Sequence, residues 1–151
     1  MSGPKEALEG FVYQDPTKRF SFVYPDGFTA TALPSDAAQT ILVQNTKTGE
    51  GIQIMITPFG SDDIDVTADD IHASLPDLSV KDAKAVMPQG GRPGLEFTGD
   101  NPAFGGTSRE IWFVWKGSLY QMSTYERYAG LLDKMFAGWR FGRTQASESS
   151  K

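Results

Sequence analysis

The 151-residue sequence contains no cysteine and a single histidine, His72. The missing cysteines exclude disulfides, thiolate nucleophiles and thiolate metal ligands. His72 is thus the only candidate base for a catalytic triad, and no nucleophile elbow accompanies it, so we expect no enzyme. The alternative is an enzyme that uses His72 or a carboxylate pair, Glu96 and Glu110, which would have to meet across a cleft.

Basic residues and long apolar runs are also scarce. Lys and Arg number 14 against 19 Asp and Glu, and the formal net charge is −5. No positive field is available to neutralise phosphates along a nucleic acid, which is therefore not an expected partner. The longest apolar runs, such as IWFVW, span five residues, far fewer than the ~20 needed to cross a bilayer.

Hydrophobic residues make up 39% of the chain and aromatic residues 12%, enough for one folded core. Both ends are polar and rich in small residues. We predict a single domain over residues 9–142, with flexible tails at 1–8 and 143–151.

Alternating apolar residues predict three β-hairpins. Their strands lie near residues 11–13 and 20–24, 41–44 and 52–56, and 110–115 and 119–125. Weaker strands are expected at 80–87 and 95–98. In the run IWFVW both faces are apolar, which indicates a central strand covered on both sides.

Two helices are predicted. Thr67 is suited to an N-cap, and Asp70 can complete a capping box, which indicates a short helix over residues 68–75. The second helix carries one apolar stripe and ends near Gly138. The stripe consists of Tyr128, Leu131, Leu132, Met135, Phe136 and Trp139. Together these elements predict an α+β fold, with a central antiparallel sheet of about six to eight strands flanked by helices.

Aspartates gather between residues 61 and 70, namely Asp62, Asp63, Asp65, Asp69 and Asp70. Such carboxylates suit a hard cation, Ca²⁺ or Mn²⁺, with Asp62, Asp63 and Asp65 as the candidate ligands. No EF-hand pattern is present, and carboxylates at a helix start are independently explained by the helix dipole. His72 has an exposed or capping role as its simpler interpretation, and Phe104 in the loop 99–106 is the candidate for an exposed partner-binding side chain.

The stretches FSFVYPDGF and GSLYQMS, followed by an amphipathic helix and GWRF, resemble the PsbP-like family over about residues 10–142. That resemblance implies an α/β/α sandwich. The family includes extrinsic subunits of photosystem II, and related folds include a nuclear import factor that binds the GTPase Ran. Many others are uncharacterised bacterial proteins that are often exported and lipid-anchored.

The resemblance implies a non-catalytic accessory module that docks on a larger protein partner. It also implies an extracytoplasmic or membrane-associated location through a leader upstream of this sequence, whereas Met1 as the native start would indicate the cytoplasm. The alternative function is binding of a small ligand or divalent cation, through the acidic loop 61–70 or an aromatic groove. No cofactor is otherwise expected.

Overall fold

The structure is a computed structural model that describes residues 10–34, 38–58, 67, 69, 71, 73, 80–91, 93–100 and 106–141. Its strands are β1 (Gly10–Gln14), β2 (Phe20–Pro25), β3 (Thr29–Pro34), β4 (Gln39–Gln44), β5 (Gly51–Pro58), β6 (Lys81–Val86), β7 (Gly94–Gly99), β8 (Ser108–Trp115), β9 (Ser118–Tyr125) and β10 (Arg140–Phe141). A 3₁₀ helix, η3 (Glu126–Tyr128), leads into the α-helix α2 (Ala129–Ala137).

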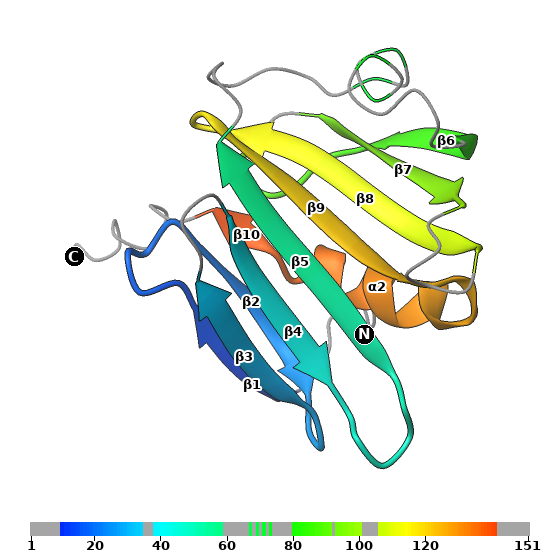
Figure 1. The fold of residues 1–151 in the computed structure, drawn as a ribbon. Coiled ribbons are helices and arrows are strands. Elements are labelled where there is room, and N and C mark those ends of the chain that lie inside the picture. The colour runs from blue at the N-terminus through cyan, green and yellow to red at the C-terminus, as the bar shows by residue number, and fades with distance from the viewer. Residues whose placement is uncertain are drawn as a thin grey trace, which may run out of the picture.

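These strands form two sheets (Figure 1). The main sheet has seven strands in the order β3-β4-β5-β9-β8-β7-β6, and the small sheet has the order β1-β2-β10. Every pairing within the two sheets is antiparallel. The predicted α+β fold with a central antiparallel sheet is thus confirmed. No helix in the described part of the chain is both long and apolar enough to span a membrane.

The isoleucine hairpin places its branched side chains in the core. Ile52, Ile54 and Ile56 are all buried along β5, and the residues between them are partly exposed. Successive side chains of a strand point to opposite faces, so the period-two pattern determines which face of β5 is buried. The prediction from the sequence is confirmed.

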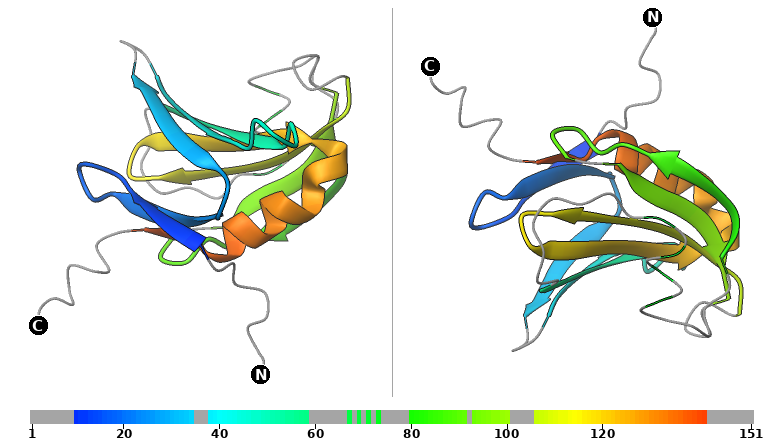
Figure 2. Two further views of the ribbon diagram at one scale, coloured as in Figure 1. Left: turned by 90° about the horizontal axis from the view of Figure 1, so that it is seen from below. Right: turned by 90° about the horizontal axis from the view of Figure 1, so that it is seen from above.

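The small sheet and α2 lie on the same side of the main sheet (Figure 2). Trp139, just after α2, stacks on Phe20 and Phe22 of β2, with ring centroids 4.8 and 5.6 Å apart. Tyr120 of the main sheet meets Phe20 edge-on at 5.7 Å. One aromatic cluster therefore joins the small sheet, the end of α2 and the main sheet.

Strand β8 is buried on both faces, as predicted. Ile111, Phe113 and Trp115 belong to the core beneath α2 and the small sheet. Trp112 and Val114 belong to a second core on the other face. That second core also contains Leu95, Phe97 and Ile71, the last from the predicted helix 68–75. In that predicted helix the structure describes residues 69, 71 and 73, which are helical.

The sequence patterns missed strand β3. Its residues, TATALP, alternate threonine with alanine, so they carry little hydrophobic contrast between the two faces. The strand is held instead by six paired positions along β4, from Thr29 opposite Gln44 to Pro34 opposite Gln39. Pairing with a neighbouring strand overrides the weak local signal.

Two glycines provide a matched test of the packing. A methyl group at Gly94 in β7 would lie 2.3 Å from the Trp112 carbonyl oxygen and 2.7 Å from the Phe113 Cβ, whereas one at Gly130 in α2 meets nothing within 4 Å. We expect Gly94→Ala to lower the free energy of unfolding by at least about 1 kcal/mol through overpacking. Gly130→Ala should raise it by about 0.5 kcal/mol through helix propensity. Urea unfolding measures both, and shifts of the same sign would contradict the described packing.

Candidate functional site

Most of the residues that the sequence singles out lie outside the described residues. These are Asp62, Asp63, Asp65, Asp70, His72 and Phe104. Asp69 is described, and it is exposed on a helical turn. Within the described ranges no three His, Asp or Glu side chains are grouped so as to hold a metal ion. The cation site in the loop 61–70 and the partner-binding role of Phe104 stay predictions.

The hypothesis of a catalytic Glu96 and Glu110 pair is wrong. The two residues do lie on neighbouring strands, but Glu96 pairs with Ile111 and Glu110 pairs with Phe97. Side chains directly opposite one another share a face, and adjacent positions alternate. Glu96 therefore lies on the α2 face of the main sheet and Glu110 on the other, where Ser123 and Trp112 donate hydrogen bonds to its Oε1.

Glu96 instead belongs to a group of charged residues beside α2. Its side chain is 3% exposed and accepts a hydrogen bond from Arg109 Nε at 3.1 Å, and Lys84 Nζ lies 3.8 Å away. Asp133 of α2 is also hydrogen-bonded to Glu96. Burial, together with this hydrogen bond and the charge of Glu96, raises the pKa of Asp133 to about 6. Asp133 thus keeps its proton to a higher pH than an isolated aspartate would.

A pocket of about 290 Å³ lies between the β1–β2 turn and the β8–β9 turn. Three cationic side chains line it: Lys18 and Arg19 from the first turn and Lys116 from the second. Trp115 and Tyr120 supply aromatic walls, and Lys116 Nζ lies 5.4 Å from the Trp115 ring centroid. This basic pocket is formed in a chain whose formal net charge is −5.

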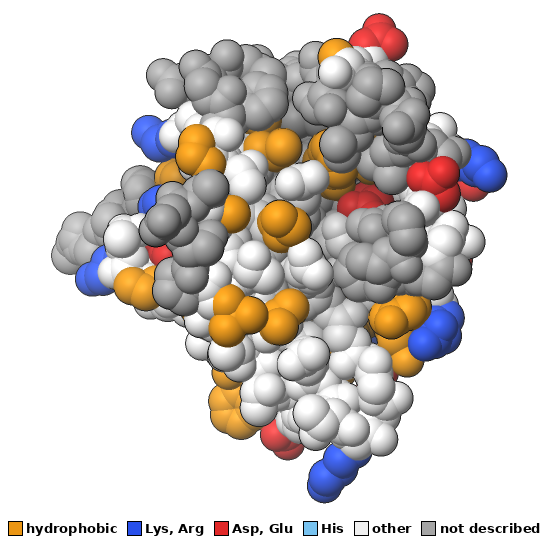
Figure 3. Space-filling view, in the orientation of Figure 1, with side chains coloured by type: hydrophobic (Ala, Val, Ile, Leu, Met, Phe, Trp, Pro, Cys, Tyr) orange, Lys and Arg blue, Asp and Glu red, His pale blue; other side chains and the backbone are white. Residues whose placement is uncertain are grey.

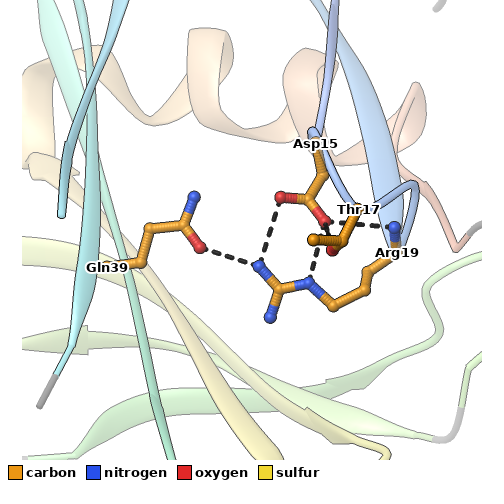
Figure 4. Close-up of polar contacts among 4 residues, drawn as sticks. All are labelled: Asp15, Thr17, Arg19 and Gln39. Atoms are coloured by element: carbon orange, nitrogen blue, oxygen red, sulfur yellow. Dashed lines mark hydrogen bonds and ion pairs between the residues drawn. The ribbon is translucent and has the colours of Figure 1, made fainter.

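Arg19 is fixed in the pocket wall by a buried carboxylate (Figure 4). Its Nε and Nη2 donate to the two oxygens of Asp15 at 2.8 and 3.2 Å, and Nη2 also donates to Gln39 Oε1 at 2.7 Å. Burial raises the pKa of Asp15, but hydrogen bonds from Arg19 and Thr17 more than offset it and leave the pKa below its ordinary value. The third guanidinium nitrogen, Nη1, points away from Asp15 and Gln39 in Figure 4.

Tyr120 places a buried hydroxyl beside Arg19. The residue is 0% exposed, and its hydroxyl has no hydrogen-bond partner among the described residues. Burial raises the pKa of Tyr120, and the nearby charges of Arg19 and Asp15 act on it in opposite directions. The phenol is therefore neutral at physiological pH and has a hydrogen to donate.

Both pocket lysines adopt backbone conformations that lysine rarely takes. Lys18 has φ 63° and Lys116 has φ 48°, and the only other non-glycine residue in the described part with a positive φ is Asp82. Lys116 and Gly117, with φ 82°, occupy the two central positions of the β8–β9 turn, where positive φ favours Asn and Gly. The pocket thus holds two lysines in left-handed positions that other residues would occupy at lower cost.

On one face of the main sheet, strands β3, β4, β5 and β9 present a surface whose described exposed side chains are all uncharged. We call it the open face; it consists of Thr31, Leu33, Thr40, Leu42, Gln53, Met55, Thr57, Leu119 and Gln121. All nine residues are at least partly exposed. Figure 3 views the molecule from this side, and its middle is white and orange, with most Lys, Arg, Asp and Glu side chains toward the rim.

Neither the pocket nor the open face was predicted from the sequence. The stretches DPTKRF and WKGSLY indicate turns, but no pattern shows that the two turns meet in space. The local signal for the pocket is the presence of lysine at a turn position that requires a positive φ. For the open face, the alternation in β5 was sufficient, because Gln53, Met55 and Thr57 are the uncharged partners of the buried isoleucines.

The fold of the chain is PsbP-like. The solution structure of cyanobacterial PsbP (CyanoP) from Synechocystis sp. PCC 6803 matches with a TM-score of 0.56 at 14% identity, over 87% of this chain and 91% of that one. A crystal structure from Bacteroides thetaiotaomicron VPI-5482 matches with a TM-score of 0.51 at 12% identity. That match covers 90% of this chain and only 50% of the other. No family model and no curated protein matches the sequence.

Asp133→Asn tests the raised pKa of Asp133 beside Glu96. The pKa of Asp133 is raised from 3.8 to about 6, so the native state binds this proton more tightly than the unfolded chain does. Ionised Asp133 therefore destabilises the fold above pH about 6, and the effect declines as the pH falls from about 6 toward 3.8. We expect the variant to melt at a higher temperature than the wild type at neutral pH, with a gain that shrinks across this window.

The matched control is Asp26→Asn, which removes the same charge from an exposed turn. It reports the effect of net charge alone on the melting temperature. If both variants change the melting temperature equally at every pH, the interaction between Asp133 and Glu96 is contradicted.

Proposed function

We propose that this domain is a non-catalytic accessory module that docks on a larger protein partner through the open face. The observation that carries the proposal is the absence of charge from nine partly exposed positions on neighbouring strands β3, β4, β5 and β9. Solvated sheet faces ordinarily carry polar side chains, and depletion of charged residues is the compositional signal of an interface core. The PsbP-like fold supports an accessory role.

The two edge strands of the main sheet also support docking at the open face. Strand β6, at one edge, contains Lys81, Asp82 and Lys84 and an irregular register with β7. Charges and bulges of this kind keep other chains from adding a strand. Strand β3, at the other edge, contains no charged residue, and Leu33 is 46% exposed. The unprotected edge adjoins the open face, so a partner could contact both.

The proposal includes a location outside the cytoplasm, which the resemblance to PsbP-like proteins supports. Fractionation of the native cells, followed by immunoblotting of this domain, tests that part separately. A purely cytoplasmic distribution would contradict it and leave the docking surface unaffected.

Charge placed on the open face should abolish docking. The double variant Gln53→Glu/Gln121→Glu places one carboxylate on each of two neighbouring strands. Glutamate has nearly the same shape as glutamine, so the fold should be retained. We expect proteins captured by the wild-type domain from the source organism to be lost with this variant, because an unpaired carboxylate would be buried in the interface. Quantitative mass spectrometry of the captured proteins measures the loss, expected to be at least tenfold.

The control for this experiment is Gln89→Glu, which makes the same chemical change at an exposed position outside the open face. It should retain the partner. A photo-crosslinking residue at position 53 should also yield a heavier covalent adduct in living cells, and the same residue at position 89 should not. The docking proposal fails if neither position yields an adduct or if both variants capture the same proteins as the wild type.

A further inference from the structure

Strand β3 ends the main sheet on one side, and among the described strands it pairs with β4 alone (Figure 1). Alternate backbone N–H and C=O groups of an edge strand point away from the sheet and have no partner in it. Thr31, Ala32 and Leu33 are all exposed, so the outer side of this strand is accessible. The edge therefore presents a row of backbone hydrogen-bonding groups that suit another extended chain.

The pairing of β3 is regular along its length. Its six residues match β4 one to one without a register shift, and none of them is charged. The opposite edge, β6, has both charges and a register shift between Lys81 and Lys84. Pro34, which has no N–H, ends β3 and limits further pairing to Thr29–Leu33. That segment is long enough for a short strand of typical length.

The two faces of β3 determine which side chains an added strand would meet. On one face lie Thr31 and Leu33, which belong to the open face. On the other lie Ala30 and Ala32, which pair with the buried Val43 and Ile41. Because alanine is small, the second face has little side-chain bulk at the edge, so larger apolar side chains of an added strand would be accommodated there.

An exposed aromatic side chain lies in the layer behind this edge. The small sheet is behind β3 and β4 in the orientation of Figure 1 and forms a separate layer in Figure 2. Phe11 of β1 pairs with Tyr24, two residues from the buried Phe22, so it lies on the face of the small sheet that is turned toward the main sheet. Its side chain is 53% exposed. The space beside Ala32 is thus bordered by apolar residues of both sheets.

We propose that the protein partner contributes an extended, uncharged segment that pairs with the outer edge of β3 and adds a strand to the seven-stranded sheet. Its apolar side chains alternate, with one set on the side of Ala30 and Ala32 and the other set beside Leu33. A charged segment would lose solvent at this edge without meeting an opposite charge. This inference rests on the proposed function, because it names the part of the partner that meets the sheet edge beside the open face.

A second copy of this chain fits the edge less well. Two β3 strands joined by a two-fold axis perpendicular to the sheet would place both small sheets on the same side of the joined strands. Strand β1 already lies behind β3 there, so the small sheets of the two copies would compete for the same space (Figure 1). A single extended segment avoids this conflict.

Phage display of random peptides against the purified domain supplies a probe. We expect the enriched peptides to be uncharged and to alternate apolar residues with others, and one synthetic peptide from this set serves for all binding measurements. Amide hydrogen exchange followed by NMR locates its site. In the free domain alternate amides of β3 should exchange fast, and the peptide should protect them. Failure to enrich peptides, or protection elsewhere with β3 unchanged, would overturn the proposal.

Ala32→Lys places a charge at this edge. The position is exposed, so the melting temperature should stay close to that of the wild type. Peptide binding should weaken about tenfold or more, because lysine on an edge strand opposes pairing. The matched control is Ala85→Lys, the same change at an exposed position of the other edge strand, β6. It should bind as the wild type does, and equal binding by the two variants would contradict strand addition at β3.

The same variant separates strand addition from docking at the open face. Ala32 is not part of the open face, and Gln53→Glu/Gln121→Glu leaves β3 unchanged. If the double variant loses the cellular partner and Ala32→Lys retains it, docking stands and strand addition is wrong. If only Ala32→Lys loses it, strand addition stands and the open face is not the interface. Sedimentation of the wild type as a dimer that Ala32→Lys dissociates would assign the edge to a second copy and overturn the proposal.

Discussion

The stacking of Trp139 against Phe20 and Phe22 is the contact on which the rest of the structure depends. It joins an early hairpin to the segment that follows the last helix, in which β10 also pairs with β2. The same group extends to Tyr120 of the main sheet, edge-on to Phe20, and Trp115 stacks on Phe141 at 4.2 Å. Aromatic rings bury large areas and fix relative orientation, so this cluster positions both hairpin turns of the basic pocket.

Local sequence patterns predict the helices and strands in which the spacing of apolar residues is clear. The isoleucines of β5 repeat at the spacing of a strand and are buried, and the apolar run of β8 is buried on both faces. In the stripe predicted for the last helix, Leu132, Met135 and Trp139 are buried, and the other three residues are partly buried. Strand β3 lacks such a contrast, and its place depends on β4. Local patterns do not predict contacts between segments that are distant in the sequence. The sequence therefore predicts both turns that line the basic pocket, but it does not predict that these turns lie next to each other.

The error over Glu96 and Glu110 has the same origin. Both residues were correctly placed on strands, and those strands are neighbours. Whether two side chains of paired strands meet is decided by register, and a shift of one residue exchanges the faces. The observed register brings Glu96 to Asp133 on α2 and Glu110 to Ser123 on the opposite face. Glu96 and the Oε1 atom of Glu110 then have hydrogen-bond partners on opposite faces of the sheet, whereas the buried Oε2 atom of Glu110 has none among the described residues. The two carboxyl groups therefore do not meet.

Strand β9 connects the open face to the basic pocket. Ser118 and Tyr120 line the basic pocket, and Leu119 and Gln121, between and beyond them, belong to the open face. Because alternate side chains of a strand point to opposite faces, the open face and the basic pocket lie on opposite sides of β9. On the pocket side, Tyr120 packs among Phe20, Phe113 and Trp139. The fold therefore keeps the two surfaces separate in space while β9 holds them in a fixed relative position.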